Sequence, residues 1–110
     1  SLKKLEIPST ITVIECFSLF GCISLEEITL PSSVILIERY SFSNCSSLIN
    51  VNFSDKLTVI NEGAFKGCIS LKEIVLPASL EKIDNRVFEG CTNLKKITFP
   101  DEIKILGEYF

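Results

Sequence analysis

The sequence contains no histidine, methionine or tryptophan, and its 11 basic residues are outnumbered by 14 acidic ones. Without histidine it lacks the commonest general acid or base, and no GxSxG or phosphate-loop motif is present. A net charge of -3 gives no clustered basic surface for a nucleic acid. No apolar run approaches the roughly 20 residues that a membrane helix needs. These absences argue against an enzyme, a nucleic-acid-binding protein and membrane insertion, and we expect no cofactor.

The sequence is instead a repeat. Aligned on a Ser-Leu or Asn-Leu pair, it divides without gaps into units 1–23, 24–46, 47–69 and 70–92, followed by a truncated unit 93–110. A unit of 23 residues is too short to bury its own apolar side, so neighbouring units must stack into one continuous core. We therefore expect a single domain over residues 1–110. Positions below are counted from the first residue of each unit.

The apolar positions within a unit predict its local structure. Positions 5 and 7 are apolar and share parity, which predicts a strand over roughly positions 3 to 7. Proline, which has no N–H, follows at position 8 in four units and ends the strand, whereas the third unit has Ser54 there. A second short strand is expected near positions 12 to 14, and then a left-handed turn or N-cap at Asn61, Asp84 and Gly107. A turn of 3₁₀ or α helix should follow and direct a column of apolar side chains inward. Phe42, Phe65 and Phe88 form this column, and Leu19 is its weakest copy.

The repeated pattern LxxIxLPxxLxxI…AFxxC resembles the leucine-rich repeat subtype of BspA-like surface proteins, which occur in oral and gut bacteria and in protist parasites. Leu76-Pro77, Ala64-Phe65 and Cys68 carry this resemblance. The generic leucine-rich pattern is met only in its first half, and its asparagine ladder has no counterpart here. The resemblance implies a mostly β, right-handed leucine-rich-repeat solenoid of about five coils of 23 residues, with open and uncapped ends.

Four of the five cysteines recur at the same position of the repeat, namely Cys22, Cys45, Cys68 and Cys91. Stacked coils would place them in a row with parallel Cβ vectors, which disfavours disulfides, so we expect them to pack as small apolar residues. The chain has no CxxC pair and no histidine, so we expect no metal site. Cys16 and Cys22 are the one pair that breaks the row, and their pairing stays an open alternative.

Two sets of side chains are candidates for contact with a protein partner. Positions 4 and 6 should face outward on the first strand, and position 13 is apolar in every unit but the fourth, which has Lys82, although alternation directs it outward. The alternative for position 13 is a narrow strand that its neighbours partly cover. Lys4 should pair with Glu27, and Glu73 with Lys96, across the sheet. The candidate protein-binding residues are Val13, Ile35, Leu36, Val59, Lys4, Glu27, Asn50, Glu73, Val75 and Lys96.

These observations predict a non-catalytic protein–protein interaction or adhesion module. The resemblance implies a surface or secreted protein that contacts host or matrix proteins. An intracellular, cytoplasmic scaffold and a structural spacer without its own ligand stay open as alternatives. The first unit lacks a polar cap and the last stops at Phe110, so we expect a piece of a longer array whose strand edges invite end-to-end self-association. Glycosylation at Asn44 or Asn52, each in an Asn-x-Ser sequence, also stays open.

Overall fold

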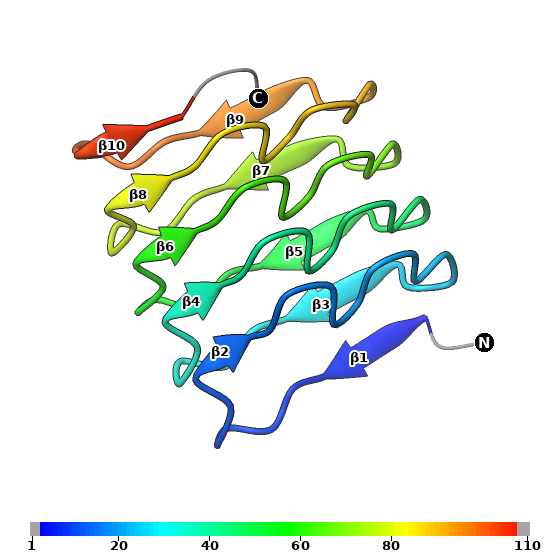
Figure 1. Ribbon diagram of the computed structural model, residues 1–110, viewed down its shortest axis with the longest axis horizontal. Helices are drawn as coiled ribbons and strands as arrows, with labels where there is room; N and C mark the ends of the chain where they lie inside the picture. The colour runs from blue at the N-terminus through cyan, green and yellow to red at the C-terminus, as the bar shows by residue number, and fades with distance from the viewer. Residues whose placement is uncertain (1–2, 108–110) are drawn as a thin grey trace.

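Each repeat unit forms one coil of a solenoid, and the coils stack in sequence order from the N-terminus to the C-terminus (Figure 1). The computed structural model describes residues 3–107, apart from the side chain of Ile105. Each coil contributes two short strands. The first strands occupy positions 4 to 6 and are β1 (Lys4–Glu6), β3 (Glu27–Thr29), β5 (Asn50–Asn52), β7 (Glu73–Val75) and β9 (Lys96–Thr98). The second strands are β2 (Val13–Ile14), β4 (Leu36–Ile37), β6 (Val59–Ile60), β8 (Lys82–Ile83) and β10 (Ile105–Leu106).

The predicted fold class is confirmed, because all strand pairs are parallel and join residues one repeat apart, as Lys4 and Glu27 show. The even-numbered strands form one continuous sheet in the order β10-β8-β6-β4-β2. The odd-numbered strands lie behind it in Figure 1 and form two sheets, β1-β3-β5 and β7-β9. Both kinds of strand are shorter than predicted. A turn begins at position 8, where the carbonyl of Pro31 accepts the N–H of Val34 at 3.0 Å.

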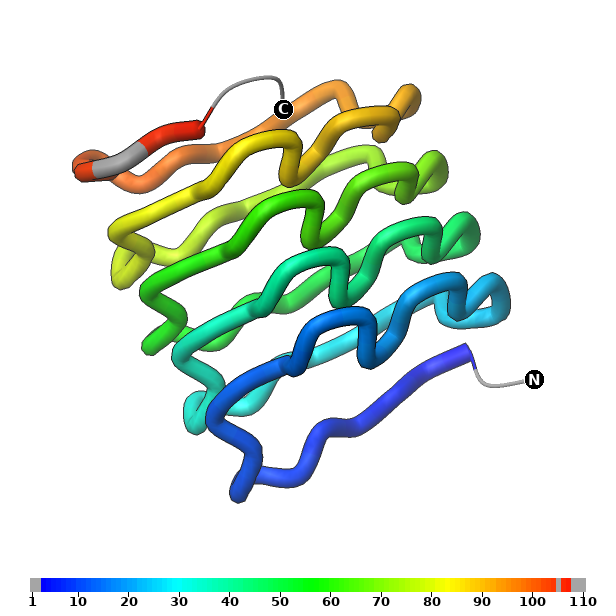
Figure 2. The backbone as a smooth tube through the Cα atoms, in the orientation of Figure 1, coloured from blue at the N-terminus to red at the C-terminus, as the bar shows by residue number. Residues whose placement is uncertain are grey.

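The third side of each coil is a chain of tight turns that Figure 2 shows repeating along the solenoid. The prediction of a helical turn here is wrong: among residues 3–107 none is helical. Left-handed residues at positions 17 and 21 interrupt any helix, and the prediction of a left-handed turn or an N-cap at position 15 is wrong as well. The left-handed residues are Phe17, Tyr40, Gly63 and Arg86 at position 17, and Gly21, Asn44, Gly67 and Gly90 at position 21.

These turns also bond to the next coil through the backbone. Residues at positions 17, 19 and 21 donate their N–H groups to carbonyls of the following coil, as Phe42 does to Ala64 at 2.8 Å. The polar backbone of this side is thereby satisfied between coils, although it forms neither helix nor sheet.

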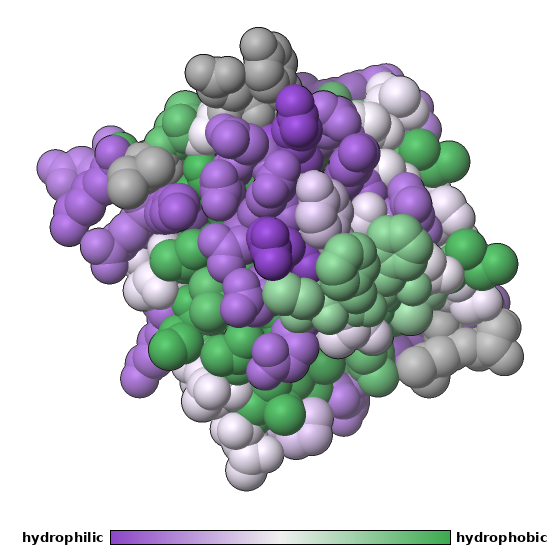
Figure 3. Space-filling view, viewed as in Figure 1, coloured by the Kyte–Doolittle hydropathy of each residue, from purple (hydrophilic) through white to green (hydrophobic). Residues whose placement is uncertain are grey.

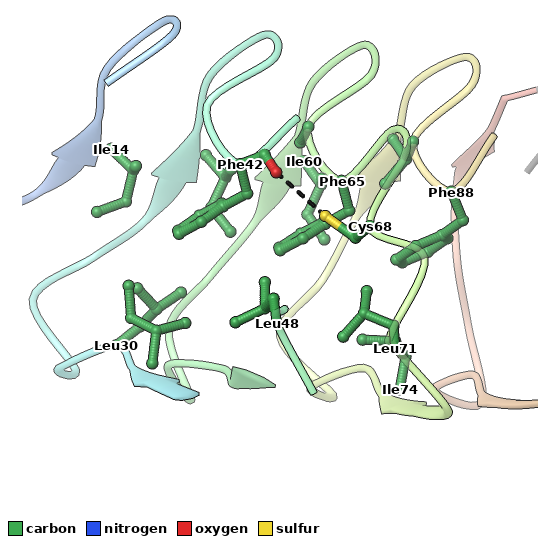
Figure 4. Packing of buried hydrophobic residues seen from close by; sticks show 14 of the residues in the cluster. Ile14, Leu30, Phe42, Leu48, Ile60, Phe65, Cys68, Leu71, Ile74 and Phe88 are labelled. Carbon is green, nitrogen blue, oxygen red and sulfur yellow. Dashed lines mark hydrogen bonds between the residues drawn. The ribbon is translucent and has the colours of Figure 1, made fainter. Parts of the chain in front are cut away.

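The core is a stack of equivalent side chains from successive coils. Phe42, Phe65 and Phe88 are buried in a row (Figure 4). The ring centroids of Phe42 and Phe65 are 5.0 Å apart, and those of Phe65 and Phe88 are 5.8 Å apart. Each such pair stabilises the fold by about 0.5–1.5 kcal/mol beyond the burial of its area. The predicted phenylalanine column is confirmed.

The repeat cysteines bind each coil to the preceding one. The Sγ atoms of Cys45, Cys68 and Cys91 each donate a hydrogen bond, 3.1 Å long, to the carbonyl at position 19 of the preceding coil. Figure 4 shows this contact from Cys68 to Phe42. All five cysteines are free thiols, including Cys16 and Cys22. The row is therefore a packed hydrogen-bonding ladder that the sequence predicted only as packing.

Candidate functional site

The odd-numbered strands present the predicted outward residues to solvent. Lys4, Asn50, Glu73 and Lys96 are exposed, and Val75 is 63% exposed. The expected ion pair between Lys4 and Glu27 forms, with 3.5 Å between Nζ and Oε2. Glu73 and Lys96 face each other in the β7–β9 register, yet no ion pair joins them among the described residues.

The predicted apolar stripe on the even-numbered strands is only partly exposed. Val13, Leu36 and Val59 are half-buried, and Ile35 is 46% exposed. Neighbouring coils cover position 13, so most of its apolar surface is already packed. The binding role of these four residues stays a prediction.

A cluster of two exposed rings and one half-buried ring, which the sequence-based site prediction missed, follows the second strands of the first two coils. We call Phe17, Phe20 and Tyr40 the aromatic patch. The Phe17 ring stacks on Tyr40 with centroids 5.3 Å apart, and its centroid is 5.6 Å from that of Phe20. Phe17 and Phe20 are 56% and 48% exposed. The signal in the sequence was the aromatic residue at position 17 of two units, outside the predicted core column.

Backbone strain accompanies the aromatic patch. Phe17 and Tyr40 have φ values of 59° and 57°, a left-handed conformation that costs roughly 1–2 kcal/mol for a residue with a Cβ. The next coil has Gly63 at the same position, and the Tyr40 ring occupies the space that a Cβ at Gly63 would need. The glycine thus lets the ring lie flat against the following coil.

Charged residues replace the aromatic ones on the C-terminal coils of the same side. Figure 3 shows apolar residues gathered over the N-terminal coils and hydrophilic residues over the C-terminal coils. Arg86 pairs with Glu62 at 3.9 Å and with Glu89 at 3.4 Å, and Lys66 also pairs with Glu89 at 3.4 Å. This half of the face satisfies its charges internally, whereas the aromatic patch leaves apolar surface in water.

The second surface feature is an opening in the sheet of odd-numbered strands. Elsewhere position 3 donates its N–H to position 3 of the preceding coil, as Ile49 does to Glu26 at 2.8 Å. Position 7 donates to position 6 of the following coil in two coils, as Leu30 does to Asn52 at 2.9 Å. Within the described structure, the N–H of Lys72 makes no such bond, and neither does the N–H of Phe53, although Ile7 also lacks the position-7 bond where β1 and β3 pair. The ladder is therefore broken between β5 and β7.

The opening forms a groove of about 510 Å³, which we call the sheet groove. Its lining residues are Asn50, Val51, Asn52, Phe53, Asp55, Glu73, Val75, Pro77 and Ala78. Coil 3 departs from its repeat at this place, with Phe53 at position 7 and Ser54 instead of proline at position 8. Phe53 packs edge-on against Phe65 with centroids 5.8 Å apart, and the buried Ser54 donates to the carbonyl of Val34 at 2.7 Å.

Cys68 and Cys91 are in the wrong state for nucleophilic chemistry, whereas the hydrogen bond with Cys68 lowers the pKa of Cys45, which is buried. The hydrogen bond with Cys45 and burial raise the pKa of Cys68, and burial raises the pKa of Cys91 to about 11. A reactive cysteine needs a lowered pKa and access to solvent. In the described part of the chain no three potential ligands come close enough to hold a metal ion, and residues 3–107 contain no helix that could span a membrane. The remaining candidates for a functional site are two surface features, the aromatic patch and the sheet groove.

The BspA-type leucine-rich repeat model, described as a region of six copies, matches residues 1–110. The chain belongs to the BspA-type leucine-rich repeat family. No curated protein matches it. Its BspA-type fold is similar to the crystal structure of a leucine-rich cell surface protein from Faecalibacterium prausnitzii, with a TM-score of 0.81 and 27% identity over 91% of this chain. The chain spans about a third of that protein, at 32% of its length.

Two further solved structures are similar. A leucine-rich repeat protein from Bacteroides capillosus is 35% identical, with a TM-score of 0.79, over 88% of this chain and 76% of that one. A leucine-rich repeat protein from T. pallidum has a TM-score of 0.62 and 24% identity, over 96% of this chain and 73% of that one, and shows the fold alone. The BspA-type solenoid is therefore well supported by relatives from several bacteria.

Proposed function

We propose that this chain is a non-catalytic protein-interaction or adhesion module of a larger surface or secreted BspA-type protein. The aromatic patch is the observation that carries the proposal. Exposed aromatic clusters are typical of binding hot spots, because large rigid rings bury much apolar area at little entropic cost. The surface location is supported by the printed name of one similar structure, a cell surface protein.

The exposed parts of the patch are large enough to matter for affinity. A buried phenylalanine removes about 150–250 Å² from water, so a half-exposed ring leaves roughly 100 Å² for a partner. At about 25 cal/mol per Å², Phe17 and Phe20 would each contribute about 2.5 kcal/mol on docking. Those contributions would offset only part of the cost of association, so the partner must also contact neighbouring residues such as Ile35.

Two alternatives have support of their own. The five free thiols suit the reducing cytosol, which favours an intracellular scaffold. The continuous even-strand sheet would suit a spacer that separates other domains. Self-association through the strand edges is a further expectation, and sedimentation at rising protein concentration tests it.

A binding screen with a patch variant tests the proposal. The chain is immobilised and exposed to purified extracellular-matrix proteins and, separately, to cytosolic extract. The variant is Phe17→Asn with Phe20→Ser, because asparagine tolerates a left-handed backbone and coil 2 has Ser43 at position 20. Lys66→Ser, at position 20 of coil 3, is the matched control.

We expect a matrix protein to bind the wild type and the control at least tenfold more tightly than the patch variant, with unchanged circular dichroism. Binding only from the extract favours the scaffold, and no binding to a folded wild type favours the spacer. Equal binding to wild type and patch variant would refute a role for the aromatic patch.

A further inference from the structure

The sheet groove has one sign of charge. Its two ionisable lining residues are Asp55 and Glu73, and neither forms an ion pair with another described residue. Glu73 does not pair with Lys96, although the β7–β9 register places the two residues side by side. The basic residues next in sequence, Lys56 and Lys72, are exposed and do not line the groove. A cationic group that enters the groove would therefore meet two carboxylates without competing with an internal partner.

The rest of the lining fits the remainder of a basic side chain. Val75 is 63% exposed, and Pro77 and Ala78 continue this apolar surface. Lysine and arginine pack their aliphatic stems on such surface while the charged head stays near carboxylates. A metal ion would gain no binding energy from contact with this apolar surface. The lining therefore favours a long cationic side chain over an inorganic cation.

The broken ladder supplies a second, independent feature. The N–H groups of Phe53 and Lys72 form no hydrogen bond with other described residues, while equivalent groups at Leu30 and Ile49 are bonded. These groups lie between two adjacent stacked coils, so the break widens the groove and does not expose a strand edge. The side-chain amides of Asn50 and Asn52 line the groove and supply hydrogen-bond donors and acceptors there.

We propose that the sheet groove binds an extended peptide segment in which lysine or arginine alternates with apolar residues. The basic side chain lies between Asp55 and Glu73, its stem packs on Val75, and the peptide backbone bonds to the side-chain amides of Asn50 and Asn52. A groove of about 510 Å³ lies within the roughly 300–1,000 Å³ typical of ligand sites. The site lies on the odd-numbered strands, so it operates independently of the aromatic patch.

The direct test is fluorescence anisotropy with a labelled, end-capped pentapeptide of alternating lysine and valine. The same peptide with glutamate in place of lysine is the charge control. We expect the basic peptide to bind at least tenfold more tightly than the acidic one. We expect Asp55→Asn with Glu73→Gln to weaken basic-peptide binding about tenfold or more.

The matched control is Asp101→Asn with Glu102→Gln. Asp101 occupies the same repeat position as Asp55 in another coil, and both control residues are exposed and lie outside the groove, so the control removes the same net charge elsewhere. It is expected to bind like the wild type. Equal weakening in both double variants would show a general charge effect and overturn the proposal, as would absence of basic-peptide binding to folded wild type.

A second variant tests the geometry. Phe53→Leu with Ser54→Pro gives coil 3 the residues that coils 2 and 4 have at positions 7 and 8, and it should close the ladder. Basic-peptide binding should then fall at least tenfold although both carboxylates remain. Full binding by this variant, with its fold confirmed by circular dichroism, would overturn the role of the groove. The Phe17→Asn, Phe20→Ser variant should bind the peptide normally, so this site and the proposed function can fail separately.

Discussion

Alanine at Gly63 is expected to destabilise the chain more than alanine at Gly21. Both glycines are left-handed, with φ values of 62° and 70°. A Cβ at Gly63 would overlap the Tyr40 ring, whereas nothing lies within 4 Å of a Cβ at Gly21. The two replacements therefore share the backbone penalty and differ in the steric one.

The magnitudes follow from these two contributions. A left-handed alanine costs about 1–2 kcal/mol at either site. At Gly63 the Tyr40 ring must also move away from Phe17, which loses a stacked pair worth about 0.5–1.5 kcal/mol. We expect a loss of about 1–2 kcal/mol for Gly21→Ala and about 1.5–3.5 kcal/mol for Gly63→Ala.

Urea denaturation followed by circular dichroism measures both free energies of unfolding. The clash is isolated by a double-mutant cycle, in which Gly63→Ala should cost less in a Tyr40→Ala background than in the wild type. Equal costs at Gly63 and Gly21, or no coupling with Tyr40, would refute the placement of the Tyr40 ring over coil 3.

Three further predictions concern the core and the thiols. Phe65→Ala should cost about 3–5 kcal/mol in urea denaturation because the ring is fully buried, and a loss below about 1 kcal/mol would contradict the ring stack. Cys16, which is exposed, should react with a thiol reagent at once, whereas fast reaction of Cys68 in the native state would contradict the buried ladder. The folded pKa of Cys91, about 11, lies above the unfolded value of about 8.5. Its contribution to stability is therefore present below about pH 8.5 and lost as the pH rises through 11. The urea midpoint should fall over this range, and an equal fall in Cys91→Ala would contradict the assignment.

The repeat register was readable from the sequence because it recurs at every unit. Leu71 and Phe65 occupy apolar columns that only an inward orientation explains, and both are fully buried. The cysteine row was likewise predictable as packing. Its bonds to carbonyls were not, because they depend on how the turns orient Phe42 in three dimensions.

The candidate surfaces were harder to predict for a physical reason. The exposure of Phe17 and the partial exposure of Tyr40 accompany the left-handed backbone at position 17, a conformation that the sequence does not indicate where the residue is not glycine. The sheet groove follows from local departures at Phe53 and Ser54. Ser54 was visible as a missing proline, but its consequence for the neighbouring ladder required the structure.

The broken ladder is the central structural claim, and residue-resolved amide hydrogen exchange tests it most directly. The N–H groups of Phe53 and Lys72 should exchange much faster than those of Leu30 and Ile49, which are bonded at 2.9 and 2.8 Å. Strong protection of both groups in the free protein would contradict the account, because it would mean that β5 and β7 pair like the other coils.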